Sequence, residues 1–423
     1  MVVAAGILLV SAGAALIVNV KLLGWLEIVL YQSARSLIVL TGGALSPTVL
    51  GALLILGGVA VVFLGLQGTI RSIAGAFLAK GDHRLVEVLQ HHRQRQRGPR
   101  VVVFGGGTGL STLLRGLKRY TTNLTAVVTV FDDGGSSGRL RRELGILPPG
   151  DIRDCLVALA ESEPLMTQLF EYRFQGGALD GHAFGNLFIA SLAGVTGDLE
   201  NAVKETSKVL NIRGRVLPSA VEDVVLTAEF VDGTVVEGES QIPRARKRIR
   251  RLRLNPSDVA PLPDVLQAVS EADLILLGPG SLYTSVIPNL LVRGVADAVR
   301  ASRGMRVYVC NLMTQPGETD GFTARDHVRV LMEQVGPGLI THVLVNTQRP
   351  RNRMLLARYE AIGAVPVEPD LTRVAALGVT PIGEALISED EVVRHDPDRL
   401  ARSVMRLLEE LPNVPARVWV ERA

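Results

Sequence analysis

The sequence is poor in cysteine and nearly balanced in charge, and each of these features excludes a class of protein. Its 423 residues contain only two cysteines, Cys155 and Cys310, so a disulfide framework is excluded and a reducing compartment fits. Neither cysteine has a metal-ligand partner at close spacing in the sequence. The net charge of +3 gives no global signal for nucleic-acid binding, so we expect no nucleic-acid partner.

The excess of hydrophobic residues is confined to the first 70 residues. Segments 2–20 and 47–70 contain no charged residue, and each is long enough as a helix to cross a bilayer. The first lacks the positive region that precedes the apolar core of a signal peptide. The second is too long and too uniformly apolar for a soluble helix. We therefore expect residues 1–70 to be a membrane region with two transmembrane helices.

Basic residues dominate the stretch that follows. Residues 71–100 hold seven Lys and Arg against Asp82 and Glu87, which places this side of the membrane in the cytoplasm by the positive-inside rule. We expect 71–99 to be a basic cytoplasmic linker that lies against anionic lipid of the inner membrane. Residues 100–423 would then form a cytoplasmic domain attached to the cell membrane, and a wholly cytoplasmic protein is the alternative.

From residue 101 onward, buried strands alternate with helices. Strands are expected at 101–104, 125–131, 307–312 and 342–347, and a further strand precedes the glycines of 273–281. Helices are expected at 110–120, 150–161 (capped by Asp151), 181–194, 199–210 and 324–335. This alternation predicts an α/β domain with a Rossmann-like parallel sheet and helices on both faces.

One stretch, 213–256, interrupts the alternation and is predicted to be a small β-rich insertion. Alternating residues around Asp232-Gly233 are typical of a β-hairpin. Seven of the ten residues from Arg244 to Arg253 are then Lys or Arg. This run fits a solvated edge strand protected by charge, or a surface for an acidic partner or lipid.

Three glycine-rich loops follow predicted strands: GGGTG at 105–109, DDGGSSG at 132–138 and GPGS at 278–281. In an open parallel sheet, ligands bind beyond the carboxyl ends of the strands. Glycine lets an anion approach backbone N–H groups, and the helix that follows adds its positive end. Three such loops at one edge favour a phosphate-bearing ligand over three tight turns.

The loops do not match a known dinucleotide or P-loop signature. No Lys-Ser/Thr pair follows the glycines, and Leu110 replaces the third glycine of G-x-G-x-x-G. Asp132 and Asp133 could bind a ribose hydroxyl or hold Mg²⁺, and Asp133 could instead cap a turn. Ser136, Ser137 and Arg139 offer donors to an anion. His182 fits a proton donor, a phosphate contact or a satisfied core histidine.

Five segments closely resemble the YvcK-type gluconeogenesis factors, which belong to the superfamily of the 2-phospho-L-lactate transferase CofD. They begin with GGGTGLSTLLRGLKRY, TAVVTVFDDGGSSGRLRRELGILPPGDIRDCLVALA and GHAFGNLFI, and end with GPGSLYTSVIPNLL and CNLMTQPGETDGFTARDHV. The resemblance covers roughly residues 100–415. It implies a Rossmann-like fold and a nucleotide site, whereas the membrane region departs from many family members.

The resemblance also implies a set of residues around the ligand. Tyr283 would stack on a base or sugar, and His182, Asn186 and the segment Asn311–Thr314 would line the rest of the cleft. The expected nucleotide- and phosphate-binding residues are Gly105, Gly106, Gly107, Thr108, Gly109, Asp132, Asp133, Gly134, Gly135, Ser136, Ser137, Arg139, His182, Asn186, Gly278, Gly280, Ser281, Tyr283, Asn311 and Thr314.

The resemblance leaves two functions open, and the basic segment 244–253 adds a third. The first is a regulator that binds a UDP-sugar such as UDP-N-acetylglucosamine and controls cell shape and envelope synthesis during gluconeogenic growth, with cell-envelope regulatory proteins or a second copy of the chain as partners. The second is a Mg²⁺-dependent transferase of the 2-phospho-L-lactate type, acting on a nucleoside-diphosphate donor. The third is a membrane scaffold that uses the basic segment.

Overall fold

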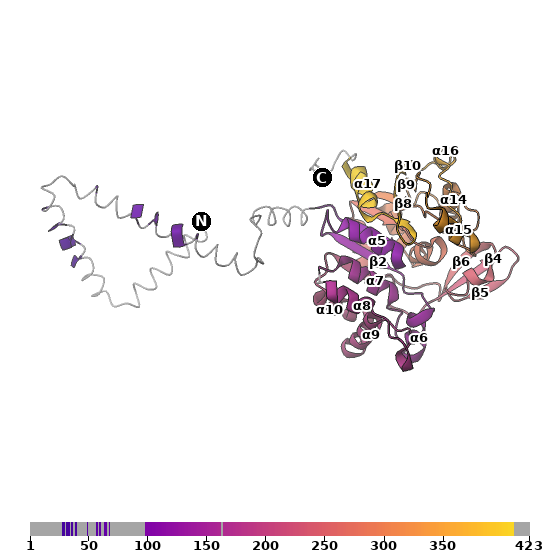
Figure 1. Cartoon of the computed structure of the whole chain (residues 1–423), viewed down its shortest axis with the longest axis horizontal. Helices are drawn as coiled ribbons and strands as arrows, with labels where there is room; N and C mark the ends of the chain where they lie inside the picture. The colour runs from indigo at the N-terminus through magenta and orange to yellow at the C-terminus, as the bar shows by residue number, and fades with distance from the viewer. Residues whose placement is uncertain are drawn as a thin grey trace. The chain divides into compact units, whose positions relative to one another are not determined.

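The computed structural model describes residues 98–161 and 164–409, together with residues 28, 29, 31–33, 35, 36, 39, 49, 56, 57, 59, 60, 63–65 and 67. The chain divides into two compact units, Met1–Leu89 and Gln90–Ala423. The described residues of the first unit are helical and exposed. All that follows concerns the second unit, whose elements are labelled in Figure 1.

A seven-stranded parallel sheet forms the centre of this unit, which confirms the predicted α/β fold (Figure 1). The strand order is β10-β9-β8-β7-β1-β2-β3. The strands are β1 (Val101–Gly105), β2 (Leu124–Val128), β3 (Arg215–Pro218), β7 (Leu274–Leu277), β8 (Met305–Val309), β9 (His342–Asn346) and β10 (Thr380–Glu384).

The strand order reverses between β1 and β7. From β1 the chain moves outward through β2 and β3, and it then returns to place β7 on the other side of β1. Residues of β1, β2 and β7 are all buried, as a strand covered on both faces requires. Loops that leave neighbouring strands at such a reversal diverge, and the gap between them is where α/β sheets bind ligands.

Helices follow the strands in the expected alternation. Helices α7 (Gly150–Leu159) and α17 (Pro397–Glu409) pack against α5 (Gly107–Leu117). A second group of packed helices consists of α11 (Pro263–Glu271), α12 (Ile287–Leu291) and α13 (Val295–Ala301). The remaining helices of four residues or more are α6 (Gly135–Leu144), α8 (Pro164–Glu171), α9 (Phe184–Thr196), α10 (Leu199–Val209), α14 (Ala324–Val335), α15 (Arg353–Ala361), α16 (Leu371–Ala375) and the π-helix η3 (Leu282–Val286).

The predicted insertion is a three-stranded antiparallel sheet that lies beside the main sheet in Figure 1. Its strands are β4 (Val225–Phe230), β5 (Val235–Glu237) and β6 (Ile249–Asn255), in the order β5-β4-β6. The basic run therefore ends in an edge strand, as expected for a charged, solvated edge. The predicted start at residue 213 is wrong, because β3 pairs with β2 in the main sheet.

Two local predictions also need correction. The segment 132–138 was expected to be a loop, but α6 begins at Gly135; a helix that opens with Gly-Ser-Ser-Gly has low intrinsic helix propensity and gives no signal in the sequence. Asp151 does not cap α7, whose N-cap is Pro149. A separate two-stranded sheet of β11 (Ile387–Glu389) and β12 (Val393–His395) was not predicted.

Among the residues that the structure describes, no helix is long and apolar enough to span a membrane. The first predicted span, 2–20, lies outside the described residues, and 47–70 is described only at scattered helical positions. The structure thus gives no support to the two transmembrane helices expected from the sequence.

Helix α17 crosses α5 so closely that only glycine fits at the crossing. A Cβ at Gly116 would lie 2.1 Å from the Pro397 carbonyl oxygen and 2.8 Å from the Ala401 Cβ. At Gly194, in α9, an added Cβ would meet no described atom within 4 Å. The two glycines therefore provide a matched pair for testing this contact.

We expect Gly116→Ala to lower the free energy of unfolding by about 1–3 kcal/mol, because the crossing must be forced apart. Gly194→Ala should raise it by about 0.5–1 kcal/mol, because alanine is the better helix former in open space. Thermal unfolding of the full chain measures both. A Gly116→Ala protein as stable as the wild type would show that the helices do not pack in this way.

Candidate nucleotide-binding site

The loops after β1 and β7 meet at the reversal of strand order, as predicted from their position at the carboxyl edge. A Cβ at Gly109 would lie 2.6 Å from the Pro279 carbonyl oxygen, and one at Gly280 would lie 3.5 Å from the Gly106 carbonyl oxygen. The two loops thus touch through their backbones. This contact explains why both loops contain residues without side chains.

A carboxylate, that of Asp151, lies closely against the first glycine loop. A Cβ at Gly106 would lie 2.2 Å from Asp151 Oδ2 and 2.6 Å from Thr129 Oγ1. Thr129 Oγ1 donates to Asp151 Oδ2 at 3.2 Å, and the Gly107 backbone N–H donates to the same carboxylate. Gly107 has φ +60°, which favours glycine. The glycines at this loop are therefore required by a contact within the protein, and the predicted phosphate contact stays a prediction.

Burial and two neighbouring acids make the Asp151 carboxyl group hard to ionise. Desolvation first, and then the charges of Asp132 and Asp154, raise its pKa to about 7. The hydrogen bonds from Thr129 and Gly107 act in the opposite direction. Asp151 therefore changes its protonation state near neutral pH.

The acids that follow β2 form the second part of the site. Asp132 Oδ1 accepts a 2.8 Å hydrogen bond from the Gly134 N–H, and Asp133 Oδ1 accepts one of 2.9 Å from the Ser240 N–H. Asp132 thus closes the turn before α6, whereas Asp133 ties this turn to the β insertion. Asp132, and not Asp133, therefore caps this turn.

The insertion brings a third acid, Glu239, to this pair. Oxygen atoms of Asp132, Asp133 and Glu239 all lie within 4.8 Å of one another. Three carboxylates are the hard oxygen ligands that Mg²⁺ prefers, so the residues fit the expected cation. Burial, and next the charge of Asp132, raise the pKa of Glu239 to about 8, which reflects the cost of crowding these acids.

Hydroxyl groups that follow β7 position a further acid, Glu318. Ser281 Oγ donates to Glu318, and it accepts from Thr284 N at 3.2 Å and from Thr284 Oγ1 at 2.8 Å. Thr284 also bonds to Glu239. Burial raises the pKa of Glu318 to about 7. Ser281 therefore acts by positioning an acid.

A cavity of about 340 Å³ opens between α6, α7 and α9 beside Asp132. This volume is at the lower end of the range for small-molecule sites. Six of its lining residues were predicted from the sequence: Asp132, Gly134, Gly135, Ser136, Ser137 and Asn186. The others were not: Gly150, Asp151, Arg153, Asp154 and Arg173.

A buried hydrogen-bond network forms one wall of this cavity. Ser136 Oγ lies 2.9 Å from His182 Nδ1 and accepts from Asn186 Nδ2 at 3.1 Å, while Arg153 Nη1 donates to Asn186 Oδ1 at 3.0 Å. Burial, and then the charge of Arg139, lower the pKa of His182. A neutral His182 that is bonded to Ser136 matches the interpretation of a satisfied buried histidine.

Several predicted ligand residues lie elsewhere in the fold. Tyr283 is 2% exposed and packs edge-to-face on Phe322 at 6.4 Å between ring centroids. Burial raises its pKa. Its ring is part of the core, so the predicted stacking on a base is wrong for this conformation. The burial of Tyr283 could have been predicted from two apolar residues of the same short helix, Leu282 and Val286.

The other outlying residues are bonded to protein groups. Thr314 is buried and accepts from the Val365 N–H, and Asn311 donates to Gln315. Arg139 donates from Nη2 to the Asp180 carbonyl, while its buried Nε has no partner among the described residues. Thr108 is exposed at the start of α5. None of these residues lines the cavity beside Asp132.

The acids that sequence reasoning missed share a local signal. Asp151, Glu239 and Glu318 each directly follow a glycine: Gly150, Gly238 and Gly317. Two of these glycines are tightly packed, since a Cβ at Gly238 would lie 2.4 Å from Asp133 Oδ2 and one at Gly317 would lie 2.0 Å from the Pro243 carbonyl oxygen. Gly197, which precedes Asp198, has no atom within 4 Å of an added Cβ, so a glycine before an acid is by itself too weak a signal to predict such a site.

The sequence model of the family described as 2-phospho-L-lactate transferase CofD matches residues 101–387, which include all these loops. The chain belongs to the CofD family. Within this family it groups with proteins named gluconeogenesis factors. This confirms the resemblance noted in the sequence.

Three similar proteins show how far the similarity extends. A putative gluconeogenesis factor of Nostoc sp. is 46% identical and covers 94% of this chain and 89% of its own. The gluconeogenesis factor of Bacillus subtilis is 49% identical and covers 74% of this chain and 99% of its own. The crystal structure of a UPF0052-family protein from Bacillus halodurans is 50% identical, with a TM-score of 0.71, and covers 73% of this chain and 99% of its own.

The raised pKa of Glu318 leads to a prediction about stability. Because its pKa rises from 4.5 to about 7 on folding, the folded protein binds more protons than the unfolded one within this window. Stability contributed by this group is therefore lost as the pH rises from about 4.5 to about 7. Glu318→Gln should be more stable than the wild type above pH 7, by about 1–3 kcal/mol, and similar near pH 5.

Unfolding of the full chain at a series of pH values measures this effect. Glu360→Gln, on the exposed face of α15, is the control and should follow the wild-type curve. Parallel curves for Glu318→Gln and the wild type would show that Glu318 is not held in a buried, acid-crowded position.

Proposed function

We propose that the cavity beside Asp132 binds a nucleoside-diphosphate-linked compound together with a divalent cation, and that the chain transfers a group from this donor to an alcohol. The observation that carries the proposal is that oxygen atoms of Asp132, Asp133 and Glu239 lie within 4.8 Å of one another, and that Asp132 also lines a cavity of about 340 Å³. The CofD family membership of residues 101–387 supports the same chemistry.

The charge of the site is the reason that a cation is needed. Asp132, Asp133, Asp151, Glu239 and Glu318 approach the cleft from different elements. A diphosphate placed among these carboxylates would be repelled. A divalent cation held by Asp132, Asp133 and Glu239 would offset that repulsion and, when bound, would neutralise charge on the phosphate oxygens during transfer.

Two arginine side chains also line the cavity beside Asp132. Arg153 and Arg173 lie among its lining residues. Arg153 is buried, and the Asp154 and Asn186 side chains accept its hydrogen bonds. Arg173 Nη1 donates to the Gly181 carbonyl at 3.1 Å. The guanidinium group of Arg153 is occupied by Asp154 and Asn186, so we propose that the remaining N–H groups of Arg173 bind the phosphate oxygens.

The buried acids provide a proton acceptor for the incoming hydroxyl. Asp151, with a pKa of about 7, is matched to general-base catalysis at neutral pH. We propose that it accepts the proton of the alcohol as the oxygen bonds to the outer phosphorus and the nucleoside monophosphate leaves. Perturbed carboxyl groups in a cleft favour such a role over passive binding.

A second candidate function uses the same site without turnover. The curated relatives are named gluconeogenesis factors, a name that states a role in metabolism and no reaction. In this alternative the chain binds a nucleotide sugar such as UDP-N-acetylglucosamine and regulates envelope synthesis and cell shape. Both candidates require nucleoside-diphosphate binding, and only the first requires product release.

The metal-ligand variants Asp133→Asn and Glu239→Gln test the proposal. Asparagine keeps an acceptor for the Ser240 N–H, so the loop should stay in place. With Mg²⁺, calorimetry of the full chain should show binding of GDP or UDP-N-acetylglucosamine, and EDTA should abolish it. Each variant should weaken binding about tenfold, which corresponds to about 1.4 kcal/mol.

Asp258→Asn, an exposed loop acid, is the matched control and should bind as the wild type does. Binding that is independent of Mg²⁺ and unchanged in both site variants would contradict the proposed site. Chromatography of the mixtures, with an alcohol acceptor present, then separates the candidates: nucleoside monophosphate indicates transfer, and intact ligand indicates the regulator.

A further inference from the structure

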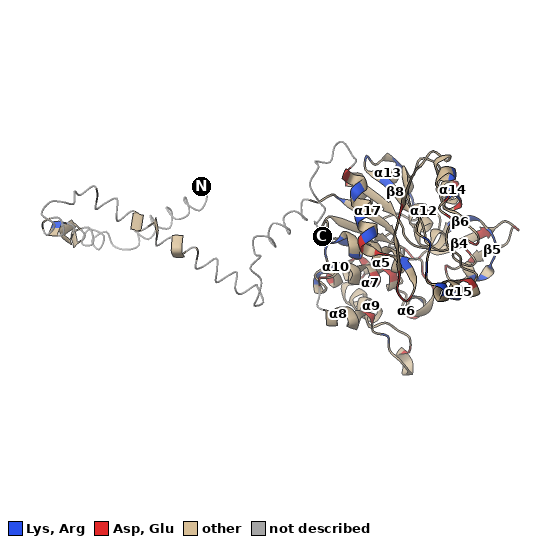
Figure 2. Ribbon diagram, turned by 45° about the horizontal axis from the view of Figure 1, so that its top comes forward, with Lys and Arg blue, Asp and Glu red and all other residues tan. Residues whose placement is uncertain are grey.

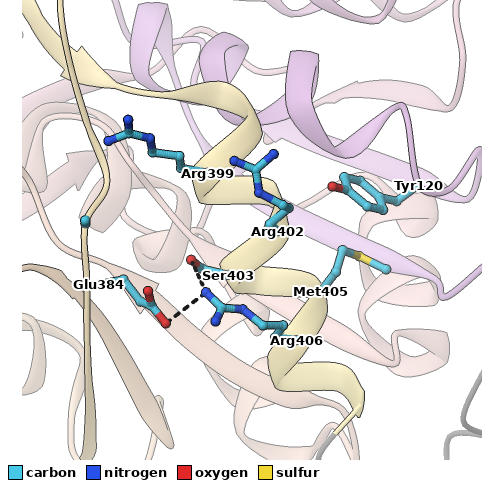
Figure 3. Close-up of a pocket in the computed structure, with 8 residues that line it drawn as sticks. Tyr120, Glu384, Arg399, Arg402, Ser403, Met405 and Arg406 are labelled. Carbon is cyan, nitrogen blue, oxygen red and sulfur yellow. Dashed lines mark hydrogen bonds and ion pairs between the residues drawn. The ribbon is translucent and has the colours of Figure 1, made fainter. Parts of the chain in front are cut away.

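A second cavity, of about 330 Å³, lies between α17 and β10 and shares no lining residue with the cavity beside Asp132. Figure 3 shows its side chains, most of which come from α17. The remaining lining residues are Tyr120, after α5, and Glu384 and Ala385, at the end of β10. It plays no part in the function proposed above.

Three arginines of α17 face this cavity: Arg399, Arg402 and Arg406. Spacings of three and four residues place them on one side of the helix, and Figure 2 shows basic residues along α17. The opposite side of the helix, which includes Leu400 and Val404, is buried in the core. An amphipathic helix on a protein surface would have this pattern without any ligand. Other observations are therefore needed to distinguish a ligand site from an ordinary surface helix.

The first such observation is the pairing of the three guanidinium groups. Arg406 pairs with Glu384 at 3.0 Å, and Arg399 pairs with Asp396 at 3.8 Å and also donates to Gln348 and to the Ile387 carbonyl. Arg402 makes no hydrogen bond or ion pair with any residue in the described part of the chain. In Figure 3 its guanidinium group extends beside Tyr120 rather than toward Glu384.

The second observation is the charge balance. Three arginines and one carboxylate, Glu384, line the cavity, so its lining carries a net charge of +2. The nearby Asp398 is already paired with Arg119 at 2.7 Å. Arg402 is exposed to solvent, and its charge is not offset by a carboxylate of the described chain.

The third observation is the shape and polarity of the lining. Tyr120 and Ala385 contribute apolar surface beside the arginines. A cavity of this size matches a small molecule rather than a protein segment. A guanidinium group binds phosphate oxygens in bidentate fashion, and an aromatic ring accepts an apolar group.

We propose that this cavity is a second ligand site, which binds a small phosphate monoester through Arg402. The phosphate would bond to Arg402, and the organic part would lie against the Tyr120 ring. Arg399, which is paired with Asp396, would add a weaker attraction. Arg406 is neutralised by Glu384 and contributes less to the recognition.

Phenyl phosphate is a suitable probe because it combines a phosphate monoester with a ring. Calorimetric titration of the full chain, in chloride buffer without divalent cations, should show saturable binding at millimolar or lower concentration. Inorganic phosphate should bind more weakly, because it lacks the apolar part. Arg402→Gln should weaken phenyl phosphate binding at least tenfold, and Arg402→Lys should weaken it less.

Arg358→Gln is the matched control, because Arg358 is an exposed helix residue of α15 and its replacement makes the same change in charge. It should bind the probe as the wild type does, and circular dichroism should show all variants folded. Equal binding by Arg402→Gln and the wild type would place the phosphate elsewhere and overturn the proposal. Arg402-dependent binding to phosphatidylglycerol vesicles, with no binding of phenyl phosphate, would also overturn it by indicating a lipid surface.

Discussion

The contact between the Asp151 carboxylate and the backbone of Gly106 and Gly107 is the constraint on which the rest of the site depends. It brings the start of α7 against the loop between β1 and α5, and Thr129, which follows β2, bonds to the same carboxylate. The segments that follow β1 and β2 thus meet the start of α7 at one carboxyl group. A side chain at Gly106 would overlap this carboxylate, so the glycine loop serves a protein contact even before any ligand arrives.

This contact also sets the electrostatics of the cleft. Asp151 lies close enough to Asp132 for their charges to raise its pKa, and Asp132 in turn raises that of Glu239. Folding crowds these carboxyl groups together and removes much of their water, which disfavours their ionised forms. A chain that keeps such a cluster does so at a cost in stability, which a bound cation would offset. The crowding of acids therefore supports the proposed metal-dependent site.

The features predictable from the sequence were those with a local pattern. Buried runs such as 101–104 and the glycines after them indicated the parallel sheet and its ligand-binding edge, and Asp132 and Asp133 were identified because they end a strand. Glu239 could not be predicted, since only tertiary folding brings the insertion to Asp133. Tyr283 was misplaced for the opposite reason: its family motif indicated a ligand, whereas packing against Phe322 buries the ring. Asp151 was interpreted as a helix cap, because its partners are more than 20 residues away in the chain.

The central claim is that Asp132, Asp133 and Glu239 hold a divalent cation beside a nucleoside diphosphate. Crystals of the protein grown with Mn²⁺ and GDP test this directly, because manganese is located by its anomalous scattering. The account predicts one strong anomalous peak between these three carboxylates, with diphosphate oxygens beside it in the cavity between α6, α7 and α9. A diphosphate bound there with no anomalous peak, or a peak at other residues, would contradict it.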